Sequence, residues 1–241
     1  MYDAKQKSEI TRAALLGLAV GDALGVPVEF MSRKKVRRVD LREMIGCDTG
    51  MPFESRWGDL IPAGAWSDDT SMAVAAMESI IAQKGEIDHD DIMSHSISKM
   101  GCVVYTVFLK ELLSAESVDA AWERTRQIDY ATYYGSEALE AYQVLLSDKF
   151  LKAGDDVIGE TRYVADSLMA AVYSMLHGKS YEEAVLCAIN LGYDTDTNAA
   201  IAGALAGAYY GESAIPDRWL NKLRKREYLE ELSERFACTR S

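Results

Sequence analysis

The sequence has little proline, with 4 residues in 241, and it contains no stretch whose alternation of apolar and polar residues would indicate a β-strand. Proline disrupts helix interiors, so its scarcity leaves room for long helices. Hydrophobic residues make up 49% of the chain, which is enough for a sizeable core. These observations predict an all-α fold, with residues 1–241 forming a single domain.

Cysteine is equally scarce. The four cysteines are far apart in the sequence and form no C-x-x-C pair: Cys47, Cys102, Cys187 and Cys238. This spacing argues against a zinc site and against a framework of disulfides, and it is typical of reduced thiols.

Long apolar runs and positive charge are also lacking. No run of 18 or more apolar residues is present, and the N-terminus lacks the apolar segment of a signal peptide, so we expect a cytoplasmic protein without a membrane partner. The 26 Lys and Arg against 38 Asp and Glu give a formal net charge of −12, which disfavours binding to nucleic acid. A phosphate-bearing ligand would need local positive charge, which a bound divalent metal would supply.

The most distinctive segment of the chain covers residues 192–211. Four consecutive residues with side-chain oxygens lie near its start: Asp194, Thr195, Asp196 and Thr197. Three glycines then recur at intervals of four: Gly203, Gly207 and Gly211. On a helix this interval places the glycines on one face, where another helix can approach closely, although each glycine costs roughly 1 kcal/mol of helix propensity. The oxygens suit a hard cation such as Mg²⁺, Mn²⁺ or Ca²⁺; alternatively, an aspartate merely caps the helix.

A second segment with the same layout is W-S-D-D-T-S-M at residues 66–72. The apolar pattern predicts a helix from about Ser71 to Gln83. Four oxygen-bearing residues therefore lie at its N-terminus: Ser67, Asp68, Asp69 and Thr70. One cap needs only one such residue. Because this excess occurs at two distant places, we interpret both segments as metal-binding.

Two further carboxylates lie in or beside an apolar segment. A buried helix is predicted from Ser8, and it ends in G-D-A-L-G-V-P-V-E-F, where Gly25 and Pro27 stop it. A buried carboxylate without a partner is costly. We interpret Asp22 as a member of a structural hydrogen-bond network and Glu29, in the loop after the helix, as a functional residue.

The rest of the chain carries less information. Residues 31–65 are predicted to be irregular, and their basic run S-R-K-K-V-R-R to be a solvated face. D-H-D-D at 88–91 predicts the start of a helix. Further helices are predicted at about 91–113, 117–128, 135–147, 161–175 and 181–191. Ser180 and Glu183 should form a capping box before the last of these, and the C-terminal R-K-R-E-Y-L-E-E-L-S-E-R should be an exposed, charge-paired helix.

Three segments together resemble the ADP-ribosylglycohydrolase family, of the dinitrogenase-reductase-activating glycohydrolase type: G-D-A-L-G-V-P-V-E (21–29), W-S-D-D-T-S-M (66–72) and residues 192–211. The resemblance covers roughly residues 10–85 and 160–212. It implies an orthogonal bundle of helices with a centre of two Mg²⁺ or Mn²⁺ ions. The implied reaction hydrolyses the bond at C1″ of the distal ribose in an ADP-ribosyl group, carried by a protein or by a small ADP-ribose derivative.

The resemblance also implies roles for particular residues. By matched motif the metal ligands are Ser67, Asp68, Asp69, Asp194, Asp196 and Thr197. Glu29 matches the acidic residue at the metals and the scissile bond, and Glu29 and Asp69 are the predicted catalytic residues. Position 67 is Ser where the family commonly has Thr, which keeps the hydroxyl.

One departure from the family leaves three functions open. The middle motif of the family, a G-N-G-[AS]-x-M-R-like loop that embraces the diphosphate and the distal ribose, has no counterpart in residues 100–160. The chain is therefore an ADP-ribosyl hydrolase with a rebuilt substrate wall, a metal-dependent ADP-ribose-binding protein without catalysis, or a hydrolase of other ribosyl or nucleotide-like substrates. The presence of Glu29 beside all six implied ligands favours the enzyme, because a binding protein would not need both.

Overall fold

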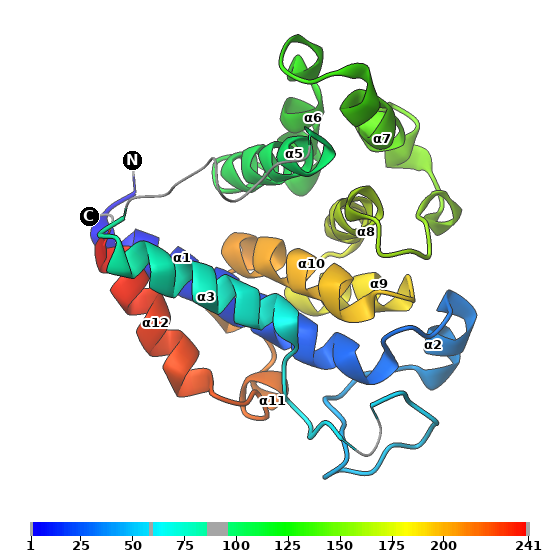
Figure 1. Cartoon of the computed structure of the whole chain (residues 1–241), viewed down its shortest axis with the longest axis vertical. Helices are drawn as coiled ribbons and strands as arrows, with labels where there is room; N and C mark the ends of the chain where they lie inside the picture. The colour runs from blue at the N-terminus through cyan, green and yellow to red at the C-terminus, as the bar shows by residue number, and fades with distance from the viewer. Residues whose placement is uncertain (1, 58–59, 86–95, 240–241) are drawn as a thin grey trace.

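The computed structural model describes residues 2–57, 60–85 and 96–239. Every regular element in these ranges is helical, which confirms the predicted all-α fold (Figure 1). The α-helices are α1 (Ala4–Gly25), α2 (Arg33–Val39), α3 (Asp68–Ala82), α5 (Ser96–Leu112), α6 (Val118–Arg126), α7 (Ser136–Leu146), α8 (Val164–His177), α9 (Tyr181–Asn190), α10 (Thr195–Tyr210), α11 (Asp217–Leu220) and α12 (Arg226–Thr239). The 3₁₀-helices are η1 (Val26–Val28), η2 (Tyr130–Thr132), η3 (Phe150–Lys152), η4 (Asp155–Val157) and η5 (Glu212–Ala214).

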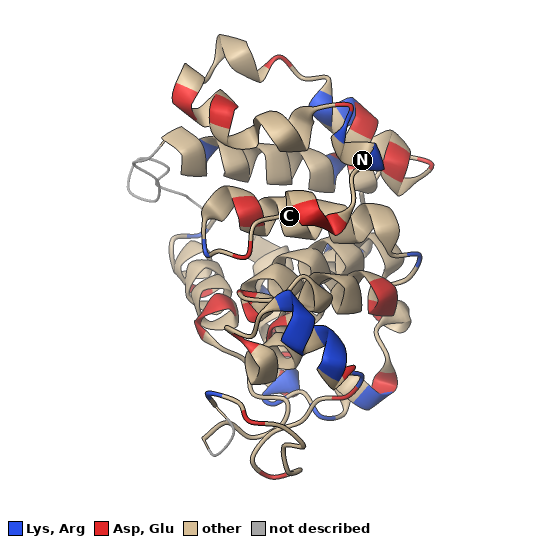
Figure 2. Cartoon of the chain, turned by 90° about the vertical axis from the view of Figure 1, so that its right-hand side faces the viewer, with Lys and Arg blue, Asp and Glu red and all other residues tan. Residues whose placement is uncertain are grey.

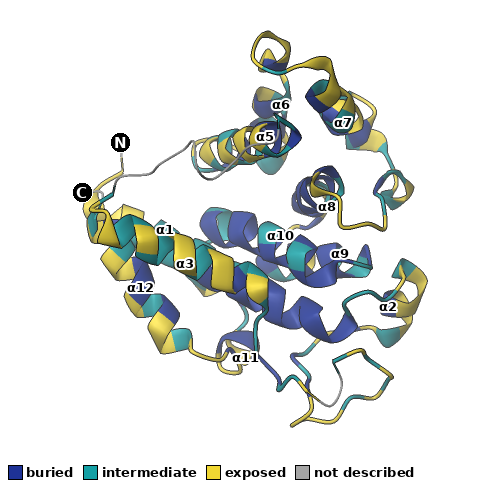
Figure 3. Ribbon diagram, viewed as in Figure 1, coloured by how far each residue is buried: buried dark blue, intermediate teal, exposed yellow. Residues whose placement is uncertain are grey.

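The pair formed by α1 and α10 is the centre of the architecture. These two helices share the most extensive contact in the described chain, with α12 packed on α1 and with α8 and α9 packed on α10. Helices α5, α6 and α7 form a further group that packs against α8 (Figure 1). One continuous core of buried apolar side chains reaches from Leu15 to Leu232, and α10 is buried along most of its length (Figure 3).

Glycines set the separation of α1 and α10. A Cβ atom on Gly203 would lie 2.2 Å from the carbonyl oxygen of Gly17, and one on Gly207 would lie 2.2 Å from the carbonyl oxygen of Ala13. The close helix approach predicted from these two glycines is therefore present. Gly211 is not part of this face: it ends α10 with a φ of 83°, and a Cβ there would have no neighbour within 4 Å.

Replacing Gly203 with alanine should destabilise the protein. The atoms in the way are backbone atoms of Gly17, which no side-chain rotation can move aside. Overpacking typically costs 1–3 kcal/mol, whereas alanine gains only about 1 kcal/mol of helix propensity. Because the clash is with backbone, the upper part of this range, about 2–3 kcal/mol, applies, and we expect a net loss of about 1–2 kcal/mol in the free energy of unfolding, measured by urea denaturation.

Gly135 provides the matched control for this substitution. It precedes α7 with a φ of −70°, and a Cβ there would meet nothing within 4 Å. Gly135→Ala should change the free energy of unfolding by less than about 1 kcal/mol. Equal effects of the two substitutions would contradict the packing argument.

Helix starts differ from the predictions for local reasons. Helix α1 begins at Ala4 rather than Ser8, because Asp3 and Gln6 form a capping box that extends it. Helix α3 begins at Asp68 rather than Ser71, because the Ser67 hydroxyl accepts from the amide of Asp69. The predicted helix start at 88–91 lies outside the described residues.

The predicted capping box before α9 is only half formed. Ser180 does cap the helix, since its hydroxyl accepts a hydrogen bond from the Glu183 amide. The Glu183 carboxylate, however, accepts from the amide of Lys179 instead of the Ser180 amide.

Two predictions about surface segments hold only in part. Residues 33–39 form α2 where an irregular chain was predicted. The basic run is mostly exposed, as predicted, but the Arg33 guanidinium is partly buried and donates to the carbonyl oxygens of Leu191, Asp155 and Ile158. The C-terminal helix α12 is exposed on one side only, because its apolar side packs on α1 and α3.

The segment Ala4–Val28 is long and apolar enough, by length and composition alone, to cross a membrane. Of its most apolar stretch of 18 residues, 72% is buried inside the protein. Its apolar character is therefore accounted for by its place in the core, between α10 and α12.

Candidate metal centre

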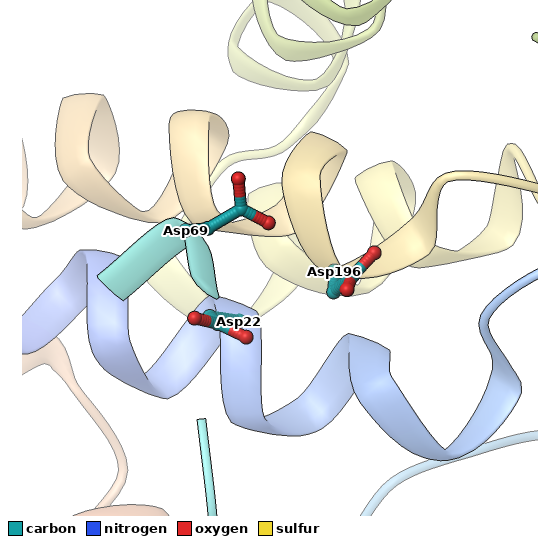
Figure 4. A group of neighbouring side chains, drawn as sticks. All are labelled: Asp22, Asp69 and Asp196. Atoms are coloured by element: carbon teal, nitrogen blue, oxygen red, sulfur yellow. The ribbon is translucent and has the colours of Figure 1, made fainter. Parts of the chain in front are cut away.

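Three helices converge where α3 and α10 begin. Asp22 comes from α1, Asp69 from the first turn of α3 and Asp196 from the first turn of α10 (Figure 4). The close approach of α10 to α1 depends on Gly25, where a Cβ atom would lie 2.4 Å from the Cα of Asp196. The two oxygen-rich segments are thus brought together although more than a hundred residues separate them, as the sequence predicted.

Asp22 holds the N-terminus of α3 in place. Its carboxylate is fully buried and accepts hydrogen bonds from the amides of Ser67 (2.9 Å) and Thr70 (3.0 Å) and from the Thr70 hydroxyl (2.6 Å). The structural network predicted for Asp22 is therefore confirmed. The same carboxylate also faces the acidic residues of the centre, a second property that the sequence did not suggest.

Two groups of carboxylates share Asp196. In the first, ligand oxygens of Asp22, Asp69 and Asp196 all lie within 4.8 Å of one another; in the second, those of Glu29, Asp194 and Asp196 do. Asp196 is 3% exposed, and its Oδ1 has no hydrogen-bond partner in the described chain. A buried carboxylate oxygen without a partner is costly unless a cation satisfies it. These oxygens fit a hard divalent cation such as Mg²⁺.

The protonation of these residues reflects the same crowding. Burial, reinforced by the charges of Glu29 and Asp69, raises the pKa of Asp196 to about 8. Burial and the charge of Asp22 raise the pKa of Asp69 to about 6. Burial likewise raises the pKa values of Glu29 and Asp194. Without a cation, the centre resists carrying its full negative charge.

The three remaining implied ligands are Ser67, Asp68 and Thr197; two of them lie near Asp69, and Asp68 is outside both carboxylate groups. The Thr197 hydroxyl donates to Oδ2 of Asp69 at 3.0 Å, and the Ser67 hydroxyl lies 3.5 Å from the same oxygen. Asp68 is exposed and belongs to neither carboxylate group, although its charge raises the pKa values of Glu29, Asp69 and Asp194. Asp194 stands at the N-cap of α10 but forms no side-chain capping bond, so capping does not explain its presence.

Glu29 is held in place by a residue that is distant from it in the sequence. The indole Nε1 of Trp57 donates to Oε2 of Glu29 at 2.7 Å. Sequence reasoning missed Trp57, because no local pattern connects two residues in separate loops. Phe30 and Tyr193 both have left-handed backbones, with φ of 63° and 64°, and the Phe30 amide donates to the Tyr193 carbonyl. Such backbone strain in non-glycine residues is concentrated at functional sites. The hydrogen bond between Phe30 and Tyr193 connects the loop of Glu29 to the residue before Asp194.

Two cavities, each of about 580 Å³, border the centre. The first, the α5–α8 cavity, is mostly apolar and includes Asp194, Thr197, Tyr105, Arg162 and Leu168. The second, the α2 cavity, is lined by Glu29, Phe30, Lys35, Arg38, Glu54 and Arg56. Each cavity thus includes a carboxylate of the centre, Asp194 in the first and Glu29 in the second, and offers space for part of a substrate.

The sequence pattern of the ADP-ribosylglycohydrolase family matches residues 3–99 and 93–240. The chain is 25% identical to ADP-ribosylarginine hydrolase Tri1 of Pseudomonas putida, over 95% of this chain and 78% of that protein. It is also 25% identical to ADP-ribosyl-[dinitrogen reductase] glycohydrolase of Rhodospirillum rubrum, over 87% of this chain and 88% of the relative.

A solved structure, described as an ADP-ribosylglycohydrolase-related protein complex, aligns with 98% of this chain and 100% of its own, at 28% identity and a TM-score of 0.63. The resemblance carried by the three sequence segments is thereby confirmed over nearly the whole chain. The protein belongs to the ADP-ribosylglycohydrolase family.

Proposed function

We propose that this glycohydrolase cleaves the C1″ bond of an ADP-ribosyl group with the help of two Mg²⁺ or Mn²⁺ ions held around Asp196. The observation that carries the proposal is the pair of carboxylate groups that share Asp196, whose buried Oδ1 has no partner in the described residues. A shared carboxylate between two oxygen-lined positions is the arrangement that a two-metal site needs.

The residues that would hold the ions are those implied by the family motifs: Ser67, Asp68, Asp69, Asp194, Asp196 and Thr197. Asp22 lies in the same group of carboxylates but is already engaged by three hydrogen bonds from α3. When bound, such ions polarise water and hold the hydroxyls of the ribose.

Glu29 is the residue we assign to proton transfer. The bond from Trp57 fixes one of its oxygens, and its carboxylate faces Asp194 and Asp196. Burial raises its pKa, which brings its basicity closer to neutral pH, where a general base is most effective. Glu29 then accepts the proton of the water that attacks C1″. Asp69, the other predicted catalytic residue, contributes negative charge that stabilises the oxocarbenium-like transition state.

The α5–α8 cavity is the place we assign to the ADP part of the substrate. Its walls are mostly apolar, and Tyr105 and Leu168 suit a nucleoside, while Arg162 provides a positive charge beside Asp194. These residues would stand in for the middle loop of the family, which this chain lacks. We choose an arginine linkage for the first substrate, because relatives from two bacteria are named ADP-ribosylarginine hydrolases.

The experiment is a paired measurement on one preparation. ADP-ribosyl-arginine is incubated with the protein in Mg²⁺ or in chelator, and released ADP-ribose is quantified; in parallel, ADP-ribose is titrated calorimetrically under both conditions. We expect release and tight binding in Mg²⁺ and the loss of both in chelator. Tight binding without release from any ADP-ribosyl linkage would support the non-catalytic binding protein instead. Release that continues in chelator would refute the role of the metal.

A further inference from the structure

The arginines of the described residues fall into two sets. Ten have a carboxylate oxygen within 4.0 Å: Arg12, Arg33, Arg37, Arg42, Arg124, Arg126, Arg218, Arg224, Arg226 and Arg235. Three have no carboxylate oxygen of a described residue within 4.0 Å, namely Arg38, Arg56 and Arg162, and all three line a cavity beside the acidic centre. Acidic residues outnumber basic ones by 38 to 26, so a carboxylate partner is the ordinary state of an arginine in this protein. The exceptions are available to an anionic ligand.

The α2 cavity has the larger share of this free positive charge. On α2, Arg33 and Arg37 pair with Asp155. Lys35 and Arg38, spaced by three residues and thus neighbours on the helix surface, line the cavity instead. Neither has a carboxylate within 4.0 Å in the described part of the protein. Figure 2, which views the side on which α2 lies, shows basic residues gathered on this short helix.

Arg56 completes the basic wall from the opposite loop. Its guanidinium lies 4.8 Å from the centroid of the Phe30 ring and 5.0 Å from that of Trp57. The aromatic faces hold the group by cation–π attraction, which does not occupy its hydrogen-bond donors, and no described carboxylate lies within 4.0 Å of it. An arginine oriented in this way is prepared to bind a carboxylate in a bidentate manner.

The described residues that line the cavity carry a net positive charge, although the protein as a whole is strongly negative. Three basic side chains face two carboxylates, those of Glu29 and Glu54. Glu29 is bonded to Trp57 and grouped with Asp194 and Asp196, and its charge also attracts that of Arg56. Glu54 is exposed and forms no ion pair within 4.0 Å in the described residues. The α2 cavity therefore favours an anionic group over a cationic one.

The position of the cavity indicates which part of a substrate reaches it. Asp194 and Thr197 line the α5–α8 cavity, whereas Glu29 lines the α2 cavity. Phe30 lines the α2 cavity together with Arg56, and its ring centroid lies 5.4 Å from the guanidinium of Arg162, which lines the α5–α8 cavity. If the ADP-ribosyl group fills the α5–α8 cavity, the group attached to its C1″ extends past Glu29 into the α2 cavity.

We propose that the α2 cavity binds the acceptor side of the substrate and that Lys35, Arg38 and Arg56 select proteins whose modified residue is flanked by aspartate or glutamate. This selection rests on the proposed function, because it assigns the cleaved bond to the space between the two cavities. It adds a preference for acidic target segments that the hydrolytic reaction itself does not require.

The test uses two ADP-ribosyl-arginine peptides that differ only in their flanking residues, Asp and Glu in one and Asn and Gln in the other. We expect kcat/KM of the wild type to be about tenfold higher for the acidic peptide, because several weak exposed ion pairs act together. The ratio should shrink as salt is added, since salt screens exposed charges. In the double variant Lys35→Gln, Arg38→Gln, kcat/KM for the acidic peptide should fall most of the way to that for the neutral peptide, which itself changes by less than about twofold.

Arg42→Gln is the matched control, since Arg42 is also exposed and basic but pairs with Asp40 outside the cavity. It should keep the preference unchanged. Equal kcat/KM for both peptides in the wild type would overturn the inference. So would an equal loss for both peptides in the double variant together with weaker binding of free ADP-ribose, because the two basic residues would then hold the diphosphate. Cleavage of neither peptide would contradict the proposed function instead, and calorimetric binding of the uncleaved peptides would then decide which flank the cavity prefers.

Discussion

Glu29→Gln should lower the rate of ADP-ribose release about 10²–10⁴-fold, which is the usual contribution of a general base. Glutamine keeps the shape of the side chain and can still accept the hydrogen bond from Trp57, but it loses the charge and the basicity. The affinity for ADP-ribose should change far less, because the product is held by the walls of the α5–α8 cavity and not by Glu29. A large loss of turnover with nearly unchanged binding is therefore the expected signature.

Turnover and calorimetric affinity are to be measured on the same preparation at saturating Mg²⁺. Glu54→Gln serves as the control, since Glu54 lines the same cavity as Glu29 but belongs to neither carboxylate group. Its turnover should stay within about twofold of the wild type on a neutral substrate. Normal turnover in Glu29→Gln would remove this residue from the mechanism.

Asp196→Asn should abolish the stabilisation of the protein by metal. A ligand that binds only the folded protein adds about 2.7 kcal/mol to the free energy of unfolding at 100 times its dissociation constant. Asp196 belongs to both carboxylate groups, so its loss disturbs both positions at once. We expect Mg²⁺ or Mn²⁺ to raise the melting temperature of the wild type and to leave that of the variant unchanged.

In the absence of metal, Asp196→Asn should raise the melting temperature of the protein at alkaline pH. The pKa of Asp196 is raised to about 8 in the folded protein, against about 3.9 for an unfolded chain. Because the pKa is raised, protonation of Asp196 stabilises the folded state. This stability is fully present at a pH below the unfolded pKa, and it is lost as the pH rises through the folded pKa. At pH 9 the metal-free wild type carries the buried charge and the variant does not, so the variant should melt at the higher temperature.

The comparison is made by thermal melts in chelator at pH 6 and pH 9 and then with added metal. At pH 6, between the unfolded and the folded pKa, part of the protonation-linked stability remains, so the advantage of the variant should be clearly smaller than at pH 9. Asp119→Asn, which removes an exposed carboxylate on α6, should alter neither the pH dependence nor the response to metal. A variant at position 196 that still gains stability from Mg²⁺ would refute the proposed centre.

The sequence predicted helices α8, α9 and α10 well but failed to predict the short helix α2. Helices α8, α9 and α10 have periodic apolar faces or clear caps, so local patterns were sufficient. Helix α2 has a basic sequence without an apolar face. Its first residue, Arg33, is held by hydrogen bonds from its guanidinium to the carbonyl oxygens of Asp155, Ile158 and Leu191. Those partners lie more than a hundred residues away, where no local pattern can indicate them.

The same division holds for the candidate site. The oxygen-rich helix starts revealed Asp69, Asp194 and Asp196, because each lies in or beside a helical first turn with more ligands than a cap needs. The support of Glu29 by Trp57 and the stacking of Arg56 on Phe30 are contacts between separate loops. Only the folded chain brings those residues together, so the second cavity and its charge could not be predicted from the sequence.

Gly25 has a consequence for engineering this protein. Replacing helix glycines with alanine is a routine way to make a protein more heat-resistant. At Gly25 the added methyl group would occupy the space of the Asp196 backbone, 2.4 Å from its Cα, and would push one ligand away from the others. The distance between the carboxylates is thus encoded partly by a residue that has no side chain. A thermostability library for this fold should keep Gly25 fixed together with the aspartates.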